Sequence, residues 1–157
     1  MPLSINYRIT GLGWAECAVA DNSSSCTITA SYLSDALRHL VLAGTAVLSG
    51  FRCVSFSFEE EPGAYRWVIK SLRTNEIELQ VIEFDSAYSE KPDAEGQLLF
   101  RTTGLPIAFA QAVQKAASEV LASLGEGGYA EQWSEHPFPT SQLLELSRLL
   151  AEEERDA

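Results

Sequence analysis

Two histidines, three cysteines and a surplus of carboxylates are the residues of this chain whose side chains could take part in chemistry. The cysteines, Cys17, Cys26 and Cys53, are odd in number, form no C-x-x-C pair and lie in apolar or strand-like segments. This pattern predicts buried free thiols that behave as small hydrophobic groups. A catalytic cysteine needs a histidine partner and an electropositive setting, and the sequence indicates neither.

The histidines are His39, inside an apolar helical pattern, and His136, which precedes Pro137 in an aromatic-rich bridge. We expect His39 to lie on a helix, at the border of its apolar face beside Leu37 and Leu40, and His136 to pack in the structure or lie at its surface. If either is catalytic, His136 is the stronger candidate, because loops carry functional residues more often than scaffold elements do. No serine lies in the strained strand-to-helix turn that a hydrolase nucleophile requires.

Two glycine clusters could suggest phosphate binding. Gly11-Leu12-Gly13 lacks the third glycine of a dinucleotide loop, since Glu16 stands at that position, and we interpret it as a hairpin turn. The glycines at 125, 127 and 128 have no following Lys-Ser/Thr pair and follow a helical pattern, so they predict a helix end. The sequence therefore predicts no cofactor.

Carboxylates are numerous enough for a cation site to be drawn from them. Glu83 and Asp85 have the spacing of one side of a strand end, and Asp93 and Glu95 lie in a polar loop. The calcium-loop pattern with a central glycine and a terminal glutamate is absent. We therefore expect no metal.

The charge is concentrated in two segments. The net charge is −11; residues 59–95 carry ten acids and four bases, and residues 126–157 carry eight acids and two bases. Residues 1–58 carry three acids and three bases. This distribution disfavours nucleic acid and anionic membranes and makes a basic protein the natural partner.

The candidate contact residues for such a partner are nine of the acids of residues 59–95 and one tyrosine of the polar loop. They are Glu59, Glu60, Glu61, Glu76, Glu78, Glu83, Asp85, Tyr88, Glu90 and Asp93. The pattern of residues 65–81 places Glu76, Glu78 and Gln80 on a polar face with Arg66 and Lys70, whose charges would satisfy some of the acids. The face is then ionic, with negative rims.

Alternating apolar and polar residues predict three strands within residues 5–30 and four within residues 54–100. A helical period of apolar residues covers 32–49, with Ser31 as its N-cap, and returns over 105–124 and from Thr140 onward. The order βββ-α-ββββ-αα predicts an α+β fold, an antiparallel sheet with helices packed on one face. We expect a single domain over 1–157 whose tail, residues 151–157, frays.

No apolar run reaches the ~18–20 residues of a membrane helix, and the N-terminus resembles no signal peptide, so a cytoplasmic location is expected.

Tyr65-Arg66-Trp67 after an acidic Pro-Gly turn, Ile82-Glu83-Phe84-Asp85, and Trp133-x-x-His136-Pro137-Phe138-Pro139 are the most distinctive strings of the chain. In these strings and in its layout, the chain resembles small bacterial α+β domains similar to the immunity proteins of polymorphic or secreted toxin systems. The resemblance implies a cytoplasmic, acidic, toxin-neutralising protein and assigns no binding residue.

The leading hypothesis is a non-enzymatic binding protein that occludes a basic toxin domain. One alternative is a homodimeric structural or interaction domain built on an exposed strand edge. Another is a small-molecule-binding or enzymatic domain that uses a cavity between sheet and helices, with His136 or Glu83 in a role.

Overall fold

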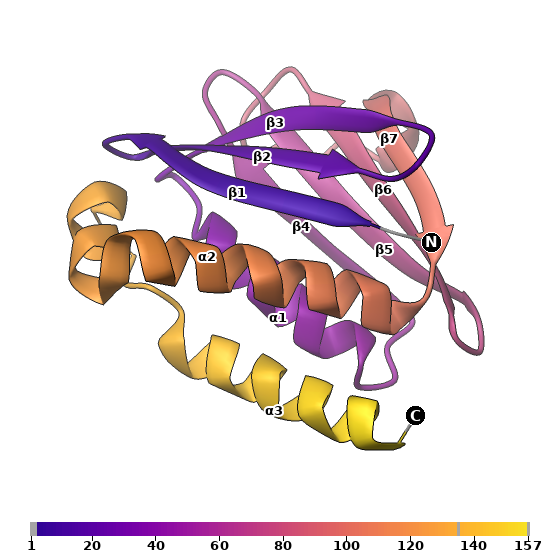
Figure 1. Ribbon diagram of the computed structural model, residues 1–157. Helices are drawn as coiled ribbons and strands as arrows, with labels where there is room; N and C mark the ends of the chain where they lie inside the picture. Colours follow the sequence, from indigo (N-terminus) through magenta and orange to yellow (C-terminus); the bar gives the residue numbers. More distant parts are fainter. Residues whose placement is uncertain (1–2, 135, 157) are drawn as a thin grey trace.

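The computed structural model describes residues 3–134 and 136–156, which form seven strands and three α-helices (Figure 1). The strands are β1 (Ser4–Gly11), β2 (Trp14–Ala20), β3 (Ser25–Ser31), β4 (Cys53–Glu59), β5 (Ala64–Arg73), β6 (Glu76–Phe84) and β7 (Gln97–Gly104). The helices are α1 (Ala36–Val47), α2 (Pro106–Trp133) and α3 (Thr140–Asp156), and a 3₁₀ turn, η1, covers Asp93–Glu95. The α+β class and the predicted order are confirmed.

The strands divide between two antiparallel sheets. One contains β1-β2-β3 and the other contains β4-β5-β6-β7, each in sequence order. The register of the first sheet aligns Tyr7 with Cys17 and Cys17 with Ile28, and all three are buried. Because side chains alternate along a strand, the intervening residues face away from the core.

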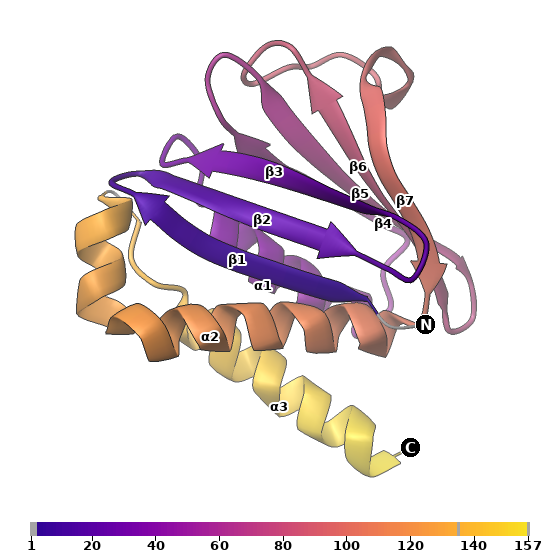
Figure 2. The same cartoon turned by 45° about the horizontal axis from the view of Figure 1, so that its top comes forward.

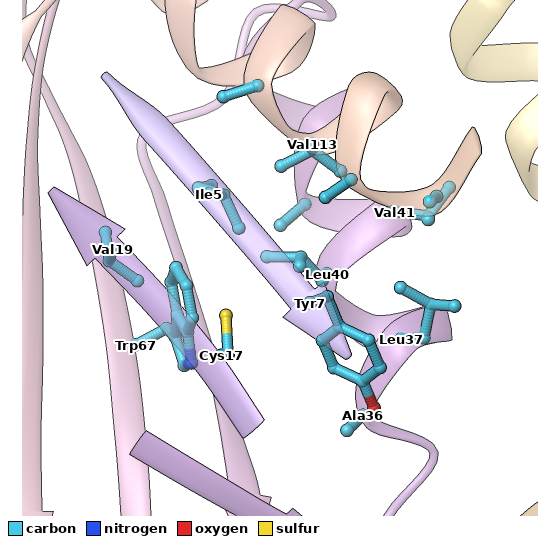
Figure 3. Close-up of a cluster of buried hydrophobic side chains, with 14 of the residues drawn as sticks. Ile5, Tyr7, Cys17, Val19, Ala36, Leu37, Leu40, Val41, Trp67 and Val113 are labelled. Carbon is cyan, nitrogen blue, oxygen red and sulfur yellow. The ribbon is translucent and has the colours of Figure 1, made fainter. Parts of the chain in front are cut away.

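The second sheet contributes an aromatic group to the core. Phe58 and Trp67 are completely buried, with ring centroids 5.3 Å apart. Tyr7 of the first sheet meets Phe58 edge-on at 6.2 Å, which joins the two sheets. Figure 3 shows side chains from strands of both sheets and from α1 and α2 converging on this interior.

The helices close the remaining side of the core. α2 runs along β1 and packs on α1, and α3 lies across both helices (Figure 2). Gly44 permits the close approach of α3, since a Cβ there would lie 3.1 Å from Leu146. No helix within residues 3–134 and 136–156 is long and apolar enough to cross a membrane.

Several boundaries differ from those expected. α1 begins at Ala36 with Asp35 at the N-cap position, and the hydroxyl of Ser31, the expected cap, accepts the Leu33 N–H instead. Residues 32–35 form a loop, in which the Tyr32 N–H donates to the Gly13 carbonyl oxygen and the Leu33 carbonyl oxygen accepts from the Tyr88 hydroxyl.

The helix ends also differ. Gly125 has a φ of 69° and breaks the helical path as expected, but the chain resumes helical geometry and continues to Trp133. α3 stays helical to Asp156, beyond residue 150, where fraying was expected.

The cysteine prediction is correct for Cys17, which is buried, and wrong for Cys53, which is exposed; Cys26 is partly buried. Cys53 pairs with Lys70 across β4 and β5, so it lies on the polar side of the sheet.

Candidate partner-binding site

The loop of residues 85–96, between β6 and β7, folds over the side of the four-stranded sheet that faces away from the core. Three apolar residues of that side, Val68, Ile82 and Phe84, are buried and form a second, smaller cluster. Gly96 lies directly on this cluster, because a Cβ there would come within 2.3 Å of Ile82 Cγ2. The loop is therefore packed on the sheet.

Arg66 is the main anchor of the loop. Its guanidinium donates hydrogen bonds to the carbonyl oxygens of Ser89 at 3.0 Å and Lys91 at 2.8 Å, and to Asp93 Oδ1 at 2.9 Å. It also lies 4.1 Å from the centre of the Phe84 ring. The Arg66 side chain is only 13% exposed. Charge-assisted hydrogen bonds of this kind are stronger than neutral ones, so one largely buried arginine side chain fixes the loop at three points.

Glu59 anchors the same loop from β4. Its Oε2 accepts the backbone N–H of Tyr88 at 2.7 Å, and the residue is 6% exposed. Its backbone is held too: its N–H donates to Ser34 Oγ and its carbonyl oxygen accepts from Ser31 Oγ. The prediction that Glu59 contacts a partner does not fit this position, because its carboxylate lies inside the protein and holds the loop.

The backbone of Tyr88 is held in place by the protein, and its side chain is exposed to solvent. The residue adopts a φ of 54°, in the left-handed region that residues other than glycine seldom occupy. Its hydroxyl donates to the Leu33 carbonyl oxygen at 3.1 Å, yet the residue is 61% exposed. A large aromatic side chain is thus fixed at the surface beside Glu90, which is also exposed.

A groove of about 550 Å³ lies where the β4–β5 turn meets the ends of the loop. Its lining includes four carboxylates, Glu60, Glu83, Asp85 and Glu95, with Lys91 as the one base. Lys91 Nζ lies 3.7 Å from Asp85 Oδ1, which leaves an excess of negative charge.

The negative charge of the groove affects the ionisation of Tyr65, which also lines it. The pKa of its hydroxyl is raised, first by partial burial and then by the charges of Glu60 and Glu83. A cationic group entering the groove would therefore meet a favourable potential.

Other predicted acids are already paired within the protein. Glu76 Oε1 lies 2.9 Å from Arg73 Nε, and Glu78 Oε2 lies 2.6 Å from Arg101 Nη2. The register confirms the predicted polar face, since Lys70 stands opposite Glu78 across β5 and β6. The protein itself offsets the charge of these two acids and of the Arg66-bound Asp93.

Glu61 forms no ion pair within residues 3–134 and 136–156. It is exposed in the β4–β5 turn, at a φ of 61°. The groove acids, Glu61, Tyr88 and Glu90 thus remain as residues that a partner could reach, and the structure brings them together around one loop and one turn.

His136 lies in a setting that ties segments together. Its Nε2 lies 3.1 Å from the Tyr32 carbonyl oxygen, and its Nδ1 lies 3.7 Å from Asp35 Oδ2. Trp133 Nε1 donates to the carbonyl oxygen of the neighbouring Ser34. Both nitrogens of His136 therefore face acceptors of the 32–35 loop, an arrangement that attaches the end of α2 to this loop.

His39 stacks on Phe56 with ring centroids 6.3 Å apart. The pKa of its imidazole is lowered, mainly by burial, so the neutral form is favoured. This is the boundary position expected from the sequence. Within residues 3–134 and 136–156, no group of three or more histidine, cysteine, aspartate or glutamate side chains is placed to hold a metal ion.

The sequence analysis did not identify three exposed apolar residues in or next to the first sheet. Leu12 is 74% exposed, and Trp14 and Tyr32 are each 42% exposed. The Tyr32 ring packs on Gly13, where a Cβ would lie 2.8 Å from the ring. The alternation of β2 already placed Trp14 on the side opposite the buried Ala15 and Cys17, and this signal could have identified it.

Comparisons with protein-family models, curated proteins and solved structures found no significant match to this chain.

Proposed function

We propose that this protein is a non-enzymatic binding protein that neutralises a basic protein partner by occluding it, most concretely as an immunity protein for a toxin domain. One observation carries the proposal: a loop anchored by Arg66 and Glu59 displays an exposed Tyr88 next to a groove lined by four carboxylates. The acidic composition and the loose resemblance to immunity proteins agree with it.

The anchoring matters because binding is weakened when a loop must be ordered at the moment of contact. Here the loop is held in advance by the three hydrogen bonds of Arg66 and by the bond from Tyr88 to Glu59. Tyr88 is fixed in place and can bury apolar area with little further loss of freedom. Tyrosine is one of the residues that most often dominates binding energy at an interface.

The groove carboxylates would mainly raise the rate at which the basic partner associates with the protein. Exposed charges of one sign steer an oppositely charged partner and raise its association rate, an effect that salt screens over about 10 Å at 0.1 M. Lys or Arg side chains of a basic cleft would enter among Glu60, Glu83 and Glu95, and the loop would block the cleft. The mechanism is occlusion and needs no chemical step.

The test is affinity capture from native lysate of the source cells at low and moderate salt, about 50 and 300 mM. The groove variant is Glu60→Gln/Glu83→Gln/Glu95→Gln, which removes three charges and keeps the side-chain shapes. The control, Glu119→Gln/Glu131→Gln/Glu153→Gln, makes the same charge change at exposed helix positions.

We expect the wild type and the control to capture one basic protein at low salt, less of it at moderate salt, and the groove variant to capture little at either. Purified partner should then lose its activity on mixing with the wild type. Capture of no basic protein by the wild type, or equal capture by the groove variant, contradicts the proposal.

A further inference from the structure

The outward side of the β1-β2-β3 sheet is the surface with the clearest unexplained character. In both overall views this side of the sheet is turned away from the helices, and its β3 edge borders the other sheet, where the side chains of Thr29 and Tyr65 share a hydrogen bond (Figures 1 and 2). The burial pattern agrees, since alternate residues of β1 are exposed from Ser4 to Thr10. This side of the sheet is called the open face below.

The register arranges the open face in three rows across the strands. The rows are Arg8/Glu16/Thr29, Asn6/Ala18/Thr27 and Ser4/Ala20/Ser25, with Trp14 next to Glu16 at one end. Apart from the first row and Trp14, the side chains are small and uncharged. A face of small side chains is flat, and flat sheet faces pack on one another about 10 Å apart.

The open face has no net charge, and this favours a second copy of the acidic chain as its binding partner. Its two charged residues, Arg8 and Glu16, form an exposed ion pair of 3.1 Å, so the face is neutral although the chain carries −11. A basic partner finds no excess of acids here. A second copy of this chain would be repelled by the acidic groove and by α3, and the open face is where two copies can approach.

The Arg8–Glu16 pair also suits a twofold arrangement. In a twofold interface each residue meets a symmetry-related one, so the surface must be complementary to itself. Two copies that face each other can exchange the pair, with Arg8 of one copy on Glu16 of the other, while Trp14 covers small side chains of the second copy. We propose that the open face, with Trp14 and Leu12 at its end, is the interface of a homodimer.

The area of the open face indicates how tightly the two copies are expected to bind. Three strands about 4.8 Å apart and seven residues at about 3.3 Å each give a flat area on the order of 330 Å². Stable interfaces bury about 800 Å² per partner, so the side-chain relief, Trp14 and Leu12 must supply the rest. We therefore expect a weak, reversible dimer.

Sedimentation velocity with the purified chain from about 1 to 300 µM tests the proposal without any other partner. The wild type should pass from monomer to dimer over this range. Glu16→Arg places two positive charges opposite each other across the twofold axis, the new arginine of one copy and Arg8 of the other, and should weaken the dimer about tenfold or more. The double variant Arg8→Glu/Glu16→Arg restores opposite charges and should restore the dimer.

The matched control is Glu131→Arg, which makes the same charge change at an exposed position of α2 and should dimerise as the wild type does. If Glu16→Arg does not unfold cooperatively, Thr27→Arg in the middle row replaces it. A wild type that stays monomeric to 300 µM overturns the inference, and so does a dimer that survives Glu16→Arg or, where it is used instead, Thr27→Arg. Neither result bears on the acidic groove, so this inference and the proposed function fail separately.

Discussion

Arg66 should contribute far more to stability than the other arginines of the second sheet, because it is the one that holds the loop. Arg66→Ala removes three hydrogen bonds and the contact with the Phe84 ring. A hydrogen bond to a charged group contributes about 1.5–3 kcal/mol when its partners stay buried. Here the loop can move and rehydrate its carbonyl oxygens, so about 1 kcal/mol per bond is the appropriate scale, or about 3 kcal/mol in all.

Urea unfolding followed by circular dichroism measures this loss of unfolding free energy. Thermal unfolding gives a second measure: for a chain of this size each kcal/mol lowers the melting temperature by roughly 2–4 °C, so a decrease of about 6–12 °C is expected. Arg73→Ala is the matched control. Its ion pair with Glu76 involves a side chain that is 78% exposed, and pairs of this kind contribute about 0–1 kcal/mol.

Hydrogen exchange separates the loop from the rest of the protein. The Tyr88 amide is bonded to Glu59 Oε2 and the Ala87 amide to the Pro62 carbonyl oxygen. Both amides should exchange faster in Arg66→Ala, while amides in β2 change only as much as global stability does. The reasoning is refuted if Arg66→Ala costs no more than Arg73→Ala, or if the Tyr88 amide keeps its protection.

Three further predictions concern packing, thiol reactivity and pH. Gly96→Ala places a methyl group against Ile82 and should cost about 1–3 kcal/mol in urea unfolding; an unchanged midpoint would show that the loop is not packed there. Cys53 is exposed, and burial raises the pKa of the Cys17 thiol well above its usual value, so mass spectrometry should find native protein labelled at Cys53 and unlabelled at Cys17. The pKa of the buried Tyr7 hydroxyl is raised, mainly by burial, so its contribution to the free energy of unfolding is present below its unfolded pKa of about 10 and is lost as pH rises further. Tyr7→Phe should therefore reduce the decrease of unfolding free energy with pH above about 10. An unchanged slope of unfolding free energy against pH would contradict this prediction.

The strands and their faces were predictable because a strand repeats every two residues. The alternation of residues 65–81 placed Lys70 and Glu78 on one polar side, and the register confirms that they stand opposite each other. The same alternation says which face a residue takes and nothing about which strands are neighbours. The alternation therefore could not predict the division into two sheets, in which β3 and β4 are not paired with each other.

The candidate site was predictable as a region and not as a set of contacts. Charge counting located the acidic segment, but whether a carboxylate is free depends on contacts across the chain. Arg66 meets Asp93 across 27 positions, and Tyr88 meets Glu59 across 29. Glu59 belongs to an acidic triplet in the sequence, and only its burial shows that it acts as an anchor.

The two proposed surfaces can be told apart by the sign of their response to salt. Binding at the acidic groove joins opposite charges, so added salt should weaken it. Dimerisation through the open face brings together two chains of −11 each, so added salt should strengthen it by screening their repulsion. The exposed Arg8–Glu16 exchange opposes this trend only slightly, because such pairs contribute about 0–1 kcal/mol. A dimer that weakens steadily as salt is added would mean that ionic contacts dominate its interface, and the neutral face would then be the wrong one.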